Sequence, residues 1–243
     1  MALLAEADKL SDLYWLIIPI VGFFALLLTV AIRERRYTRS YVRVPTESVS
    51  WLSPYVRRMS DDALAAEFVF GDYVAHSKPS IKICGTVWMS RDGRTLLVAT
   101  SGTVSGLRSK QTFLYSPLND GTYLCTTDNI GESDPSGMYR FKRVWNGLFS
   151  SLSKVHQNRL QNAGATVTKF RETSPFTALD ELCNRRIELM VNKGLAHYID
   201  PDQVCWRHSF LGALHICKGF FVQLGQAALQ FWRRYMPGAG AAV

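Results

Sequence analysis

The sequence predicts an α+β protein with a single N-terminal transmembrane helix, an antiparallel β-meander sheet packed with helices on one face, and a long C-terminal amphipathic helix. Three observations predict this arrangement. A long uncharged run lies near the N-terminus, two Asp-Gly dipeptides separate β-rich runs in the middle, and helical periodicity dominates the C-terminal part. The chain has 243 residues, 47% of them hydrophobic, which is enough for one medium domain and an anchor.

The uncharged run covers residues 13–32 and reads LYWLIIPIVGFFALLLTVAI. As a helix it would be roughly 30 Å long, which matches the hydrocarbon core of a bilayer. The leader at residues 1–12 is acidic and no small-residue cleavage pattern follows the run, so a cleaved signal peptide is disfavoured. A buried core helix is a further alternative, although core helices seldom stay apolar on every face over this length. We therefore expect an uncleaved, single-pass anchor.

Arginines cluster directly after the predicted span. Residues 33–58 contain seven arginines against two glutamates, and basic residues favour the cytoplasmic side of a membrane. We therefore expect an inner-membrane protein with an external leader, a basic juxtamembrane linker at residues 33–58 and a domain in the cytoplasm. Five cysteines at irregular spacing agree with reduced thiols there.

Both ends of the predicted domain are basic, whereas the middle is nearly neutral. This distribution favours anionic lipid headgroups or a membrane-protein partner over nucleic acid, which would need a basic patch on the folded domain. An orientation signal alone would explain the first cluster equally well. The residues expected at the bilayer surface or a partner are Arg33, Arg35, Arg36, Arg39, Arg43, Trp232, Arg233 and Arg234.

The central domain is expected over residues 59–208. A short helix near residues 60–66 opens it, and β-rich runs follow at residues 68–74, 81–89, 95–100, 111–118 and 122–127. One Asp-Gly dipeptide ends at Gly93 and another at Gly121, each between two of these runs. Because type I′ hairpin turns need positive φ, we expect both glycines in left-handed conformations within an antiparallel meander.

Helical patterns follow the meander. One helix is expected within residues 139–162, a short strand at 165–170, and another helix from Ser174-Pro175, with Leu179, Leu182, Arg186 and Leu189 along one side.

A final amphipathic helix is expected at residues 209–236, before a flexible tail at 237–243. We expect its first half to pack on the domain and its second half to meet the membrane surface or a partner.

A search for catalytic motifs finds none: there is no Walker loop, G-x-S-x-G elbow, H-E-x-x-H or G-x-G-x-x-G. His197, Cys205 and His208 come nearest to a metal site, but structural zinc usually needs four ligands in two pairs. His156 is expected on the exposed side of its helix. We therefore predict no catalytic residues, no cofactor and no metal.

Four segments carry a resemblance: SRDGRTL at residues 90–96, DGTYLCTT at 120–127, HQNRL at 156–160 and RHSFLGA at 207–213. In these the chain resembles a group of uncharacterised bacterial proteins with one N-terminal span and a cytoplasmic α+β domain. The resemblance implies the anchored architecture and no particular activity.

Three functional hypotheses follow from the sequence. The first is a membrane-anchored accessory or scaffold protein that holds an interaction domain at the cytoplasmic face. The second is a module that binds a small molecule or a lipid between the sheet and its helices. The third is a hydrolase with an unrecognised Ser, His and Asp set, which would require a histidine within hydrogen-bond reach of a nucleophile and a carboxylate.

Overall fold

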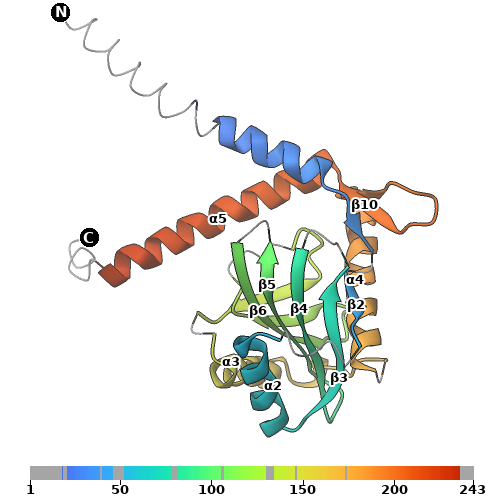
Figure 1. Ribbon diagram of the computed structural model, residues 1–243, viewed down its shortest axis with the longest axis vertical. Coiled ribbons are helices and arrows are strands. Elements are labelled where there is room, and N and C mark those ends of the chain that lie inside the picture. The colour runs from blue at the N-terminus through green and yellow to red at the C-terminus, as the bar shows by residue number, and fades with distance from the viewer. Residues whose placement is uncertain are drawn as a thin grey trace, which may run out of the picture.

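The computed structural model describes residue 18 and residues 21–38, 40–45, 52–77, 81–104, 107–129, 134–145, 147–172 and 174–235. Within these ranges the chain is α+β with a large mixed sheet (Figure 1). That seven-stranded sheet follows the order β2 (Tyr41–Arg43), β3 (Phe68–His76), β4 (Ile81–Ser90), β5 (Leu96–Val104), β6 (Leu107–Pro117), β7 (Tyr123–Thr127) and β8 (Tyr139–Arg143). The strands β2 to β7 pair antiparallel. The last strand, β8, pairs with β7 in parallel.

Helices cover both faces of this sheet, which corrects the prediction of helices on one face (Figure 1). The helices α2 (Pro54–Ala65) and α3 (Phe149–Ala163) lie on one face, and α4 (Pro175–Asn192) lies on the other. The alternation of a β-strand explains the two cores: Trp88 packs under α2 and α3, whereas its neighbours Val87 and Met89 share a core with α4. Apolar residues at consecutive positions of β4 and β5 are therefore buried on both sides.

A second, three-stranded sheet pairs a strand from the N-terminal part of the chain with two strands from the C-terminal part. Its strands follow the order β1 (Arg36–Tyr37), β10 (Cys205–His208) and β9 (Ala196–Tyr198), all antiparallel. None of these strands was expected from the sequence, because runs of two to four residues carry no readable period. The predicted strand at 165–170 is instead a 3₁₀ turn, Gly164–Thr166, with a single bridge from Val167 to Leu118.

The C-terminal helix α5 (Phe210–Tyr235) starts directly after β10. Ala213 and Cys217 on this helix are buried, and the ring of Phe221 lies 5.8 Å from that of Phe24 in a helical segment at residues 21–33. Figure 1 shows these two helices leaving the domain beside the three-stranded sheet. The tail predicted at 237–243 lies outside the described residues.

The predicted transmembrane helix is wrong. Among the described residues, no helix has both the length and the apolar character that crossing a membrane requires. Of the run at 13–32, the structure describes Ile18 and residues 21–32, and the helix from residue 21 to residue 33 is about 20 Å long. The rest of the run and the leader at 1–12 lie outside the described residues. The single-pass inner-membrane location and the cytoplasmic orientation were inferred from this helix, so these two predictions are wrong as well.

The two predicted hairpins are confirmed. Gly93 connects β4 to β5 with φ of 69°, and Gly121 connects β6 to β7 with φ of 80°. A side chain with a Cβ atom is strained at positive φ, and a β-branched one most of all.

We therefore expect Gly93→Val to lower the free energy of unfolding by about 1–2 kcal/mol, measured by urea denaturation. No atom outside the turn lies within 4 Å of the Cβ that valine would add, so the loss would report backbone strain alone. Arg94→Val, at the exposed next residue, is the control and should change stability much less. Equal losses in both variants would contradict the strain argument.

Candidate functional site

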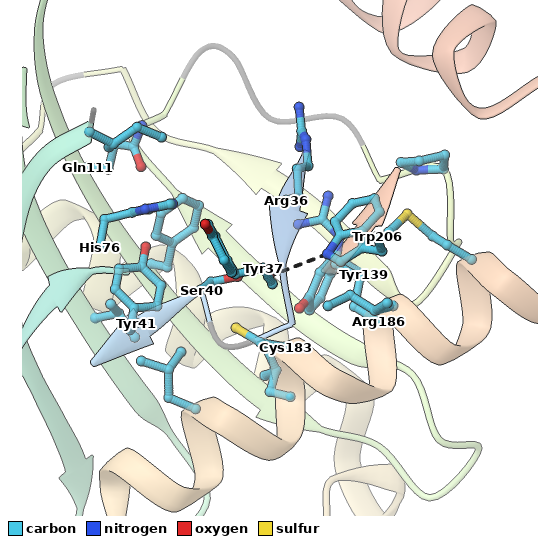
Figure 2. Close-up of a pocket in the computed structure, with 18 of the residues that line it drawn as sticks. Arg36, Tyr37, Ser40, Tyr41, His76, Gln111, Tyr139, Cys183, Arg186 and Trp206 are labelled. Carbon is cyan, nitrogen blue, oxygen red and sulfur yellow. Dashed lines mark hydrogen bonds between the residues drawn. The ribbon is translucent and has the colours of Figure 1, made fainter. Parts of the chain in front are cut away.

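A cavity of about 470 Å³ lies between the α4 face of the seven-stranded sheet, α4 itself and the three-stranded sheet (Figure 2). Strands β3 to β6 and β8 provide one wall, and α4 provides another. A third side is closed by β10 together with Glu34, Arg36, Tyr37, Ser40 and Tyr41. Residues from nearly the whole length of the described chain therefore meet at this one cavity.

The middle of the cavity is apolar. Val98 and Phe113 line it from the sheet, and Leu182 lines it from α4. The ring of Phe113 stacks on that of Tyr115 at 5.6 Å, so the sheet side presents a flat aromatic surface. Such a lining favours contact with an apolar molecule over contact with water.

Charged groups gather at one end of the cavity, where Figure 2 shows Arg36, Arg186, Tyr139 and Trp206 close together. Arg36 comes from β1 and Trp206 from β10, and the two residues are direct partners in the antiparallel register. The Arg36 guanidinium lies 5.6 Å from the Trp206 ring centre and donates a 2.9 Å hydrogen bond from Nη2 to Glu34. Its Nε is buried and has no hydrogen-bond partner among the described residues.

Arg186 reaches the same end of the cavity from α4. Its Nε lies 3.5 Å from a carboxylate oxygen of Asp134, and its guanidinium lies 5.5 Å from the Tyr139 ring centre. The Asp134 side chain is only 2% exposed and accepts hydrogen bonds from the backbone N–H groups of Ser136 and Tyr139. A buried carboxylate and an aromatic ring therefore fix the position of the Arg186 side chain.

His208 also lines this end. It is 2% exposed, and its ring packs edge-on against Trp206 with centroids 4.8 Å apart. Neither ring nitrogen has a hydrogen-bond partner among the described residues. Burial, followed by the charges of Arg36 and Arg186, lowers the pKa of His208 to about 3, against weaker opposing effects of the Leu195 carbonyl and Glu34. The imidazole is therefore neutral at physiological pH.

The opposite end of the cavity is polar without a fixed charge. Tyr41, His76 and Gln111 line it, from β2, β3 and β6 (Figure 2). The rings of Tyr41 and His76 meet edge to face, 6.0 Å apart. The cavity thus has a cationic end, an apolar middle and a polar end, which would orient an elongated ligand.

The structure separates the residues predicted to contact a membrane surface or a partner. Arg36 alone among those described enters the cavity. Arg33 and Arg35 are exposed beside it, and Arg43 on β2 pairs with Asp72 at 3.5 Å. Arg39 lies outside the described residues. Three further predicted residues belong to α5, but their side chains lie outside the described part: Trp232, Arg233 and Arg234.

Sequence analysis missed Arg186, Trp206 and His208 as site residues. The sequence contains a sign of Arg186, because this residue interrupts an otherwise apolar face of α4. It also contains a sign of the residues in β10, because Trp206 and His208 are two residues apart and therefore share one face of the strand. Cys205 and His208 are an odd number of residues apart, so the C-x-x-H spacing directs them to opposite faces of the strand. Within the described ranges, no group of three potential metal ligands lies together.

His156 is buried, which corrects the prediction that it lies on the exposed side of its helix. Its Nε2 and Nδ1 each lie 2.9 Å from a hydroxyl oxygen, of Ser116 and Thr126 respectively. Neither partner is a carboxylate, so this group lacks the third member that the hydrolase hypothesis requires. We interpret it as a structural network between α3 and the sheet.

Comparisons with known proteins identify no relative of this chain. The chain matches no protein-family model, no curated protein and no solved structure.

Proposed function

We propose that this protein is a binding module for a small, predominantly apolar molecule that occupies the cavity between α4 and the two sheets. The observation that carries the proposal is a cavity of about 470 Å³ with an apolar middle and polar groups at both ends. Ligand pockets in proteins typically measure about 300–1,000 Å³ and combine mostly apolar walls with a few placed polar groups. The size supports this function, and the lining combines apolar side chains with placed polar groups, although polar groups make up a larger share of it than in a typical pocket.

The arrangement of the walls also favours ligand binding over simple core packing. Protein interiors pack at the density of organic crystals, whereas this cavity is partly open to solvent and is not filled by side chains. Here the side chains of Phe113, Leu182 and Met190 leave a space far larger than a methyl group. A ligand would fill that space and contribute about 25 cal/mol for each Å² of apolar surface that it buries.

The accessory-protein hypothesis depended on the transmembrane helix, so its main support is gone. The hydrolase hypothesis gains no support from His156, because both of its hydrogen-bond partners are hydroxyl groups. The ligand-binding hypothesis alone gains a specific observation.

A fluorescence titration with N-phenyl-1-naphthylamine, an uncharged apolar dye, tests the proposal. We expect saturable binding to the full chain, and at least about tenfold weaker binding to Cys183→Trp. Cys183 lines the cavity from α4 and is half-buried, so an indole at this position would occupy the space of the dye (Figure 2). Glu188→Trp is the matched control, because Glu188 is exposed on the same helix and does not line the cavity.

Circular dichroism would establish that both variants are folded. Unchanged dye binding to a folded Cys183→Trp, or equal losses in both variants, would contradict binding in this cavity.

A further inference from the structure

Arg36 and His208 lie at the same end of the cavity and both contact Trp206. The Nε of Arg36 and both ring nitrogens of His208 are buried without hydrogen-bond partners among the described residues. Buried polar groups in folded proteins are almost always paired, because leaving one unpaired costs free energy. Two such groups against one indole, both lining a cavity, therefore indicate that a ligand supplies the missing partner.

The missing partner is an acceptor of hydrogen bonds. Arg36 Nε can only donate, and a neutral imidazole carries one N–H donor that can point to the same acceptor. The potential at His208 is positive, since Arg36 and Arg186 outweigh Glu34 in their effect on its pKa. An oxygen with a negative charge fits both the donors and this potential.

The charges already present favour a ligand with one negative charge over a ligand with two. Each guanidinium has an acidic partner, Glu34 for Arg36 and Asp134 for Arg186. The two pairs nearly balance, and His208 is neutral, so a dianion such as a phosphate monoester would leave more uncompensated charge in a buried place than a monoanion would. A carboxylate carries a single charge and matches the planar edge of a guanidinium.

We propose that the ligand is a carboxylic acid with an apolar body, whose carboxylate accepts hydrogen bonds from Arg36 and His208 while the body lies along Val98, Phe113 and Leu182. This inference rests on the proposed function, because it assigns the chemical class of the molecule in the same cavity. The cationic end would hold the carboxylate, and the apolar middle would hold the body.

Displacement of N-phenyl-1-naphthylamine by decanoate and by decanol tests the inference on the full chain. The two competitors share one apolar chain and differ in the charged group. We expect decanoate to displace the dye at about a tenfold lower concentration than decanol, since a hydrogen bond to a charged group strengthens binding by about that factor or more.

Two variants locate the carboxylate. Arg36→Gln should weaken decanoate binding about tenfold and leave decanol binding unchanged. Arg35→Gln is the matched control, because Arg35 is the exposed neighbour of Arg36 and does not line the cavity, and it should change neither. His208→Phe keeps an aromatic ring against Trp206 but removes the donor, so it should also weaken decanoate selectively.

The outcomes separate the two proposals. Dye binding that is blocked by Cys183→Trp, with equal displacement by decanoate and decanol, would keep the proposed function and overturn the carboxylate. The carboxylate would also be overturned if Arg36→Gln and His208→Phe weakened the binding of decanoate and of decanol to the same degree. Absence of saturable dye binding, with no binding of either competitor by calorimetry, would overturn both.

Discussion

Gly85→Ala is expected to destabilise the protein by about 3 kcal/mol or more, an effect large enough to unfold a marginal domain. Gly85 lies in the middle of β4, directly opposite Thr100 of β5. A Cβ atom added here would lie 1.9 Å from the carbonyl oxygen of Ala99 and 2.8 Å from the Cα of Thr100. Both are backbone atoms, so no side-chain rotation can relieve the clash.

The position of β5 makes this clash costly. It pairs with β4 over nine residues and with β6 over nine more, so it cannot move away from one neighbour without disturbing the other. Residues on both faces of β5 are also buried, Val98 against the α4 side and Leu97 against α2 and α3. A close-packed interior of this kind transmits strain instead of absorbing it.

Urea denaturation followed by circular dichroism would measure the loss. Gly22→Ala is the matched control: it adds the same methyl group in the exposed helical segment at residues 21–33, where no atom lies within 4 Å of it. That variant should keep or slightly raise stability, because alanine favours helices by up to about 1 kcal/mol over glycine. An unchanged denaturation midpoint in Gly85→Ala would show that the two strands can separate without loss.

Much of the domain could be predicted from the sequence where a local rule applies. The two hairpins are an example, because Asp-Gly turns at Gly93 and Gly121 depend only on φ preferences of neighbouring residues. The start of α4 at Pro175 is another, since proline is favoured in the first turn of a helix.

The cavity could not be predicted in this way, because it depends on contacts between distant parts of the chain. The pairing of β1 with β10 brings Arg36 to Trp206 across 170 residues of sequence, and no local period records it. The apolar run at 13–32 led to a wrong prediction for a related reason. Hydropathy alone does not distinguish a helix that contacts lipid from a helix that contacts another helix. In the structure, Phe24 from that run packs against Phe221 of α5.

Acid is expected to destabilise the protein steeply between about pH 6 and about pH 4. The pKa values of His156 and His208 are both lowered to about 3, chiefly by burial, whereas an exposed histidine titrates near 6.5. Below that value the unfolded chain binds two protons that the folded chain does not. Stability is therefore complete above about pH 6.5 and falls as the pH decreases towards 3, by about 1.4 kcal/mol per pH unit for each histidine.

His156 makes the clearer test, because its two nitrogens already have partners. Protonation would place a second positive charge beside Arg159, whose Nη1 donates to the same Thr126 hydroxyl at 3.0 Å and which already lowers the pKa of His156. Asp128 opposes the trend, since burial raises its pKa and the folded state therefore gains a proton there as the pH falls. One carboxyl group offsets only part of the effect of two histidines.

His156→Gln removes one titrating group and should reduce the slope of unfolding free energy against pH by about half, while lowering stability at pH 7 through imperfect hydrogen bonds to Ser116 and Thr126. His197→Gln, on the exposed face of β9, is the matched control for the substitution itself. Urea denaturation at a series of pH values measures both. A slope that is the same in the wild type and in His156→Gln would show that this imidazole gains its proton without unfolding, and the network between α3 and the sheet would then have to accept an imidazolium.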